Sequence, residues 1–461
     1  MSKREQSTRL ELRTIQPIAL DQRHGKARDL FTVWFGSNVM LLTIVTGGLA
    51  VTVFKLSFVA AVIALTLGNL IGAIFMALHA AQGPTLGVPQ MVQTRGQFGS
   101  LGSILVVALV IIMYVGFFVS NLVLGGQSIA AIVPSVHVFV AIVVMGLISV
   151  AGAVFGYDLI HTYARVMSWA CGLVLALAFF WIVFVHGLPS GYLQRGHYSA
   201  NGMLGAISVA ALWQIAYAPY VSDYTRYMPA DTGPVPAFWA SYWGCAIGSI
   251  LPMILGALVG VCVAGEDIVG GLARLTDGAA PLVLLTFAVG MIVGNTMNIY
   301  CGSLCVLTIG QTLWPKWQPQ APARAVAAGV LLIIALALAL LGRESFMAKY
   351  TEFILLLLYV LVPWTAINLV DYYLVRHGDY DVASFMQADG GIYGRINAAA
   401  VLCYLLGILV QMPFFSSPMY TGFVARALHG ADVSWIVGLV VTSPLYYYAV
   451  RWSERREALS A

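Results

Sequence analysis

Long apolar stretches alternate with short polar or glycine- and proline-rich connections along almost the whole chain. A helix of about 20 apolar residues crosses a bilayer core, and twelve stretches reach that scale. They lie at about 30–54, 57–82, 103–131, 136–156, 161–187, 203–222, 235–265, 281–311, 323–342, 350–376, 397–416 and 431–451. The pattern therefore predicts an all-α polytopic membrane protein with twelve transmembrane helices.

The ends of the chain are polar. Residues 1–29 carry seven basic and four acidic side chains and no sustained apolar run, which is unlike a cleavable signal peptide. We expect a cytoplasmic N-terminal tail at 1–29, a transmembrane domain at 30–451 and a cytoplasmic C-terminal tail at 452–461. Between the second and third helices, "QGPTLGVPQMVQTRGQFGS" at 82–100 is expected to be a polar connection.

The basic residues orient the predicted helices. With both termini in the cytoplasm, 17 of the 23 Lys and Arg residues fall on the cytoplasmic side and six on the other. Basic residues concentrate on the cytoplasmic side of membrane proteins. We therefore expect an integral protein of the cytoplasmic (inner) membrane with both ends inside.

Composition excludes several classes of protein. The chain is 60% hydrophobic and 9% charged, against roughly 25% charged in an average soluble domain, so an ordinary water-soluble enzyme is excluded. A net charge of +4 gives no sign of nucleic-acid binding. No H-E-x-x-H motif or carboxylate pair lies within a span, so we expect no catalytic residues, metal or cofactor. A passive channel is disfavoured because charged rings are missing. The expected surroundings are lipid, with no obligate protein partner.

Two of the predicted helices contain interruptions. Gly36, Ser37 and Asn38 fall in the first span and Pro219 in the sixth, five spans later. Transporters built from inverted five-helix repeats break these two helices around a central binding site. Such repeats would occupy about 30–187 and 203–376, with two extra helices at about 397–451. A simple structural kink at Pro219 is equally compatible with the sequence.

Aromatic and amide side chains gather on the helices that could face these interruptions. The third span places Tyr114, Phe117 or Phe118, and Asn121 on one face. The sixth adds Trp213, Gln214 and Tyr217, and the eighth Asn295, Thr296 and Asn298. None carries a formal charge, so a neutral, planar solute that accepts and donates hydrogen bonds would suit them. Asp223, near the end of the sixth span, is either an interfacial partner of Arg226 or a gating or proton-linked group.

Several segments together resemble a known family. They are "WFGSN" in the first span, "RGQFGSLGS" after the second, "YVSDYTRYMP" closing the sixth, "NTMNIYCGSL" in the eighth, and "LVPWTAINLVDYYLVRHG" with "GGIYGRIN" around the tenth. In this order they resemble the nucleobase-cation symporter family, which includes purine, cytosine, allantoin and hydantoin permeases. The "DYTRYMP" and "NIYCGSL" stretches are more similar to the purine-cytosine branch.

This resemblance implies a fold and an activity. The fold would be the LeuT-like five-plus-five inverted repeat with two additional C-terminal helices. The activity would be secondary active import of a nucleobase-like heterocycle, a purine or cytosine, coupled to H+ or Na+ by alternating access. Allantoin, a hydantoin, uracil or a pyrimidine vitamin precursor are alternative solutes.

The resemblance also implies a substrate site. Related members hold a heterocycle between aromatics of the third and sixth helices, with amides on the third, sixth and eighth. Tyr114 matches the third-helix aromatic, and Phe118 stands where a polar residue is expected one turn later. Gln214 matches the sixth-helix aromatic and follows Trp213. The expected substrate-binding residues are Asn38, Tyr114, Phe117, Phe118, Trp213, Gln214, Tyr217 and Asn298.

In sodium-coupled relatives an ion lies between the first-helix break and the eighth helix. The matching positions are Gly36, Val39, Ile292, Asn295 and Thr296. Thr296 keeps a hydroxyl, whereas Asn295 has an amide where a second hydroxyl is usual, although amide oxygens also bind hard cations. Proton coupling is equally compatible, with Asp223 as the candidate group.

Overall fold

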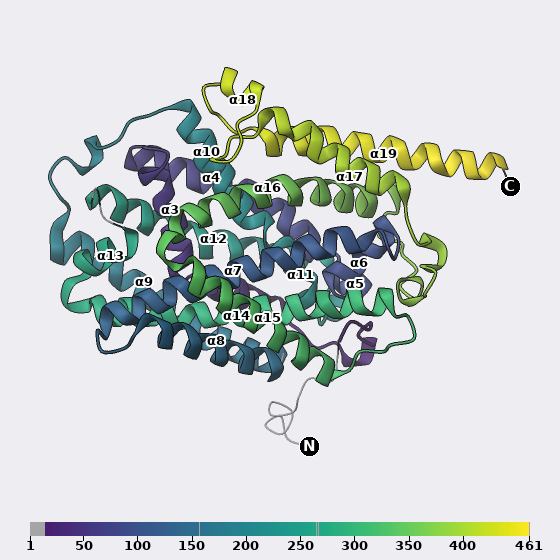
Figure 1. Ribbon diagram of the computed structural model, residues 1–461, viewed down its shortest axis with the longest axis horizontal. Coiled ribbons are helices and arrows are strands. Elements are labelled where there is room, and N and C mark those ends of the chain that lie inside the picture. Colours follow the sequence, from purple (N-terminus) through teal and green to yellow (C-terminus); the bar gives the residue numbers. More distant parts are fainter. Residues whose placement is uncertain (1–13, 156, 264, 266, 461) are drawn as a thin grey trace.

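The computed structural model describes residues 14–155, 157–263, 265 and 267–460. Each of the twelve predicted spans coincides with a helix or helix pair (Figure 1). These are α2 (Ala27–Asn38) with α3 (Leu41–Thr52), α4 (Phe58–Ala80), α7 (Ser103–Ile132), α8 (Val138–Phe155), α9 (Tyr157–Phe180), α10 (Ala200–Ile215) with α11 (Ala218–Thr225), α12 (Pro234–Cys262), α14 (Ala280–Leu313), α15 (Ala321–Gly342), α16 (Phe346–Val370), α17 (Ala398–Gln411) and α19 (Ser434–Ser460). Among the described residues, up to nine spans are long and apolar enough to cross a membrane by themselves.

The first and sixth spans are both interrupted. α2 and α3 meet at a 60° bend, because Val39 leaves the helical conformation and Met40 is extended. α10 ends at Ile215 and α11 begins at Ala218. Pro219 lies in the first turn of α11, where a proline costs no hydrogen bond. The sixth span is therefore interrupted by two residues just before Pro219, but Ala200–Thr225 still forms one span without the sharp bend of the first.

The helices pack as two groups around these breaks. The pair α2/α3, α4, the pair α10/α11 and α12 form one bundle, and α7, α8, α9, α14 and α15 form the other. Glycines let α3 and α12 approach closely: a Cβ on Gly256 would lie 1.8 Å from Ile44 O, and one on Gly47 would lie 2.1 Å from Met253 O. α17 and α19 lie side by side along one edge and pack on α16 (Figure 1).

The segment at 82–100 is not the exposed polar connection that its composition suggests. It forms the short helix α5 (Gly83–Leu86) and α6 (Gln90–Phe98), and every residue of α6 is buried. The buried Arg95 guanidinium makes three hydrogen bonds. It donates to Phe385 O at 2.6 Å, Thr308 O at 2.8 Å and Thr312 Oγ1 at 2.7 Å. Two further helices, α13 (Ile268–Thr276) and α18 (Phe423–Ala427), were also not predicted.

The predicted tails differ from their expected boundaries. Residues 1–13 lie outside the described residues, but Ile15 and Ile18 are buried and α2 already begins at Ala27. Thr14 donates to Pro319 O at 3.0 Å and accepts from Arg226 Nη1 at 2.9 Å. At the other end, α19 continues to Ser460, so most of the predicted tail at 452–461 is helical, and Ala461 lies outside the described residues.

Candidate functional site

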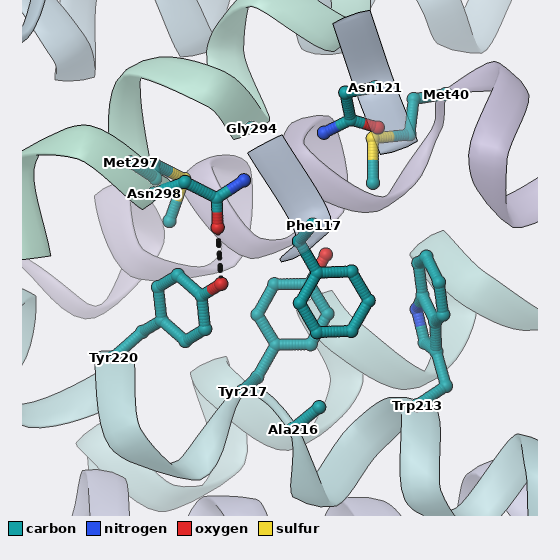
Figure 2. Close-up of a pocket in the computed structure, with 10 residues that line it drawn as sticks. All are labelled: Met40, Phe117, Asn121, Trp213, Ala216, Tyr217, Tyr220, Gly294, Met297 and Asn298. Carbon is teal, nitrogen blue, oxygen red and sulfur yellow. Dashed lines mark hydrogen bonds between the residues drawn. The ribbon is translucent and has the colours of Figure 1, made fainter. Parts of the chain in front are cut away.

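A narrow cavity lies where the two broken helices meet α7 and α14 (Figure 2). The centre of a water molecule has about 20 Å³ available in it, and roughly 10–15 Å³ is needed to hold one water. A larger molecule therefore enters only if the surrounding helices or side chains move apart. The wall consists of Met40, Phe117, Asn121, Trp213, Ala216, Tyr217, Tyr220, Gly294, Met297 and Asn298.

Aromatic rings form one side of the cavity. Phe117 meets Trp213 edge-on with ring centroids 5.9 Å apart, and Tyr217 lies 6.2 Å from Trp213. The Trp213 ring is held from behind, because its Nε1 donates to Asn38 Oδ1 at 2.8 Å. The same oxygen accepts from Ser249 Oγ at 2.8 Å. Asn38, predicted to contact substrate, thus lies outside the cavity wall and positions Trp213.

Two amides face the cavity from opposite helices. Asn121 on α7 is 1% exposed, and its buried Oδ1 has no hydrogen-bond partner among the described residues. Asn298 on α14 is 4% exposed, and its Oδ1 accepts from the Tyr220 hydroxyl. Figure 2 shows the Asn298 amide nitrogen turned toward the interior of the cavity. No lining residue carries a formal charge.

Three other predicted substrate residues lie outside the wall. Tyr114 donates to Pro219 O at 2.9 Å, and Phe118 is buried elsewhere on α7. Gln214 donates to Asn69 Oδ1 at 2.7 Å and Ser249 Oγ at 3.0 Å. Consecutive helical residues point roughly 100° apart, so Trp213 reaches the cavity while Gln214 turns into the helix bundle.

Phe117, Trp213, Tyr217 and Asn298 are the predicted residues that the structure does bring together. The expected substrate-binding residues did not include the other six, although Asn121 had been placed on the candidate face of the third span: Met40, Asn121, Ala216, Tyr220, Gly294 and Met297. Helical spacing carried a usable signal for two of them, since Asn121 follows Phe117 by one turn and Tyr220 follows Tyr217 by nearly one. Nothing in the sequence distinguishes the two methionines from core residues.

The predicted side-chain cation ligands, Asn295 and Thr296, do not point at the first-helix break. α14 presents glycines to the first-helix break: a Cβ on Gly290 would lie 3.6 Å from Val39 O, and one on Gly294 would lie 3.5 Å from Met40 Sδ. Thr296 points instead at α8, where its hydroxyl lies 3.4 Å from Ser149 O, and it donates to Ile292 O at 2.7 Å.

Gly36, Val39 and Ile292 match the family site through their carbonyl oxygens. Gly36 packs against α9, where a Cβ would lie 2.2 Å from Ser168 Oγ. Asn295 is buried with no partner for either amide atom among the described residues. Since Asn295 follows Gly294 directly, it points roughly 100° away from the face that meets the break.

Asp223 is deeply buried. Its side chain is 1% exposed and accepts from the Gln90 backbone N–H at 2.8 Å. Arg226 is fully buried and directs its guanidinium to Thr14 O and, at 3.2 Å, to the Tyr300 hydroxyl. Asp223 is therefore not a water-exposed interfacial residue, and it lies one turn beyond Tyr220 on α11.

Sequence comparison decides the family. The model for a family described as permeases for cytosine/purines, uracil, thiamine and allantoin matches residues 17–438. The chain belongs to this permease family. It is accordingly an integral membrane transporter and not an enzyme.

Individual relatives agree with this assignment. YxlA of Bacillus subtilis (strain 168), provisionally named a purine-cytosine permease, is 38% identical over 447 residues, covering 96% of each chain. The purine-cytosine permease fcyB of Emericella nidulans is 24% identical over 463 residues, covering 95% of this chain and 87% of its own length.

Solved structures confirm the LeuT-like fold. The nucleobase-cation-symport-1 transporter Mhp1, closed with bromovinylhydantoin bound, matches with a TM-score of 0.78 and 17% identity over 96% of each chain. A Na+-coupled sialic acid symporter matches with a TM-score of 0.60 and 13% identity, covering 93% of this chain and 89% of its own.

Proposed function

We propose that this permease imports a neutral nucleobase-like heterocycle, a purine or cytosine, by alternating access. The observation that carries the proposal is the cavity wall: aromatic rings and two amides, without formal charge, where the bend between α2 and α3 meets the interruption between α10 and α11. Stacking a base on an aromatic side chain contributes about 1–3 kcal/mol. Amides that pair with a polar edge also discriminate against solutes that leave them unpaired.

The wall offers one arrangement for such a solute. Phe117 and Asn121, one turn apart on α7, supply an aromatic and an amide, and Trp213 and Tyr217 supply rings from α10 and the adjoining break. Asn298 supplies the second amide from α14. The family resemblance matched Tyr114 and Phe118 to the aromatic and the polar residue of the third helix. Phe117 and Asn121 lie three residues further along, close to one helical turn. With this pair, the polar position is filled by an amide, as the resemblance implies.

Access from one side depends on α16. Tyr350 hydrogen-bonds the Thr46 hydroxyl of α3 at 2.7 Å, and Phe353 lies edge-on against Phe117 at 5.3 Å. These contacts cover the cavity between α3 and α16. Solute entry in an alternating-access cycle would require them to part.

We propose a proton as the coupling ion. Gly290 and Gly294 offer no side-chain oxygen at the first-helix break, and the Thr296 hydroxyl faces α8. A hard cation such as Na+ needs several oxygen ligands. The buried carboxyl of Asp223, one turn from the cavity residue Tyr220, is the proposed proton-linked group.

The alternative solutes can be compared by their charge, because the cavity wall is uncharged. Uracil, allantoin and hydantoins are neutral and remain compatible with it. A pyrimidine vitamin precursor stays an alternative solute. Yeast TPN1, named a vitamin B6 transporter, is 24% identical over 378 residues, covering 75% of this chain and 62% of its own length. Thiamine, a permanent cation, is disfavoured because no lining residue is acidic. The distribution of basic residues supports the inner membrane with both termini cytoplasmic.

Uptake into proteoliposomes tests this function. Radiolabelled adenine, hypoxanthine, cytosine and uracil would each be offered under an inward proton gradient, an inward Na+ gradient, or neither. We expect accumulation of at least one base with the proton gradient only. Accumulation driven by Na+ alone would contradict the proposed coupling, and no specific uptake of any heterocycle in the panel would contradict the proposed function.

A further inference from the structure

The Asn298 amide has a neighbour that controls which way it faces. The Tyr220 hydroxyl donates to Asn298 Oδ1 across the cavity wall (Figure 2). A primary amide has an oxygen that only accepts and a nitrogen that only donates. With its oxygen engaged by Tyr220, Asn298 turns its nitrogen, and therefore hydrogen-bond donors, toward the interior.

Tyr220 is itself held firmly. It lies in the first turn of α11, directly after Pro219, and is 4% exposed. The Tyr114 ring meets it edge-on with centroids 4.4 Å apart, and the Tyr114 hydroxyl anchors Pro219 O at 2.9 Å. Tyr217 packs on its other side at 5.5 Å. The phenol therefore has little freedom to follow a rotated amide.

Rotating the Asn298 amide by about 180°, so that its oxygen and nitrogen exchange places, would be energetically unfavourable. The Tyr220 hydroxyl would then lose Asn298 Oδ1 as its hydrogen-bond acceptor. A buried donor left unpaired costs roughly five- to a hundredfold or more in an equilibrium. Asn121 differs, because its Oδ1 has no partner among the described residues, so no hydrogen bond to that oxygen fixes the direction of its amide.

We propose that Tyr220 is a specificity-determining residue, which locks Asn298 as a donor and so selects neutral heterocycles presenting a hydrogen-bond acceptor at that position. The acceptor is a ring nitrogen or a carbonyl oxygen. A solute that presents N–H there meets the Asn298 nitrogen donor to donor. This inference rests on the proposed function, because it concerns the same cavity.

Two pairs of bases test the inference. Adenine and hypoxanthine differ by exchange of an acceptor and a donor along one edge, as do cytosine and uracil. Dissociation constants of all four would be measured by competition binding on the purified full-length protein. We expect the wild type to prefer one member of at least one pair by about fivefold or more.

The variant Tyr220→Phe removes only the hydroxyl. Asn298 should then turn either way, and the preference within the pair should fall to about twofold or less. Tyr224→Phe is the matched control: it makes the same change one turn later on α11, at a residue outside the cavity wall. It should retain the wild-type preference.

Each outcome has a distinct meaning. If the wild type binds none of the four bases, the proposed function is contradicted. If it binds them without preference, or if Tyr220→Phe keeps the wild-type preference, only the role of Tyr220 is overturned.

Should Tyr220→Phe fail to fold, ligands alone test the proposal on the wild type. Removing the acceptors of the preferred base one at a time should cost about fivefold or more at one position. Equal affinity for every such analogue would overturn the proposal.

Discussion

Asn38 lies outside the cavity wall, but its side chain fixes the position of the Trp213 ring. Asn38, the last residue of α2, accepts from Trp213 Nε1 and Ser249 Oγ through a single oxygen. Its nitrogen donates to Trp34 O at 2.7 Å. One amide therefore links the first break to the sixth and seventh helices.

Asn38→Ala should weaken solute binding without removing a solute contact. The Trp213 indole N–H would be left buried and unpaired, which costs about 1–3 kcal/mol. We expect the dissociation constant of the preferred base to rise about tenfold and the melting temperature to fall. Ser249→Ala, which leaves the Asn38–Trp213 bond in place, should have a smaller effect on both measurements; equal effects would argue against this positioning role.

Asn298→Ala tests the second amide directly. Losing its hydrogen bond to the solute should weaken binding by about 1–3 kcal/mol, with normal insertion into the membrane. Isothermal titration with purified protein would measure the change. An unchanged affinity would remove Asn298 from the site.

The sequence identifies the helices that line the cavity but not which residues of those helices face it. The sequence indicates that rings and uncharged amides gather on the third, sixth and eighth helices, and they do. It does not distinguish Trp213 from Gln214, because a shift of one residue moves a side chain roughly 100° around the helix. Asn121 lines the cavity and Phe118 does not, because of how α7 is rotated about its axis against α14. Tertiary packing sets this rotation, and the sequence of α7 alone does not show it.

The helix α6 was not predicted, because the search for long apolar stretches does not detect a buried polar helix. The segment Gln90–Phe98 is rich in polar side chains, yet it is wholly buried. Two of its polar groups are bound by distant segments: Asp223 accepts from the Gln90 N–H, and Arg95 reaches three oxygens on two other elements. Long apolar helices are identifiable because lipid imposes their length, whereas a buried polar helix depends on tertiary partners.

Arg95→Met should destabilise the protein substantially. Burial lowers the pKa of Arg95 to about 10, so the side chain remains charged at neutral pH and pairs with Phe385 O, Thr308 O and Thr312 Oγ1. Methionine would remove all three hydrogen bonds from the guanidinium, although Thr308 O would still accept from the Thr312 hydroxyl; we expect a loss of about 3 kcal/mol or more. Thermal unfolding in detergent would measure it, with Arg165→Met, an exposed arginine, as the control; equal melting temperatures for the two variants would contradict this role.

Considered as a whole, the molecule consists of two helix groups that meet at the cavity, and the N-terminal segment bridges them at one end. Thr14 binds both Arg226, beyond α11, and Pro319, between α14 and α15. Relative motion of the two groups would therefore have to release this segment. Asp223 lies close to this bridge, next to the Gln90 backbone and three residues before Arg226.

Asp223→Asn should abolish proton-driven accumulation of the base while leaving exchange of the base across the membrane intact. An amide cannot carry the proton of a carboxyl group, so proton-driven accumulation of the base should be lost. Exchange of labelled for unlabelled base across the membrane needs no net proton movement and should persist. Counterflow and gradient-driven uptake in the same proteoliposomes would measure both; accumulation at the wild-type level would exclude Asp223 from coupling.

An experimental structure of the protein with its preferred base would show directly whether the base binds in this cavity. We expect flat density among Phe117, Trp213 and Tyr217, with polar atoms of the base within about 3 Å of the Asn121 and Asn298 amides. A base bound elsewhere at saturating concentration, with this cavity still closed and empty, would contradict this expectation.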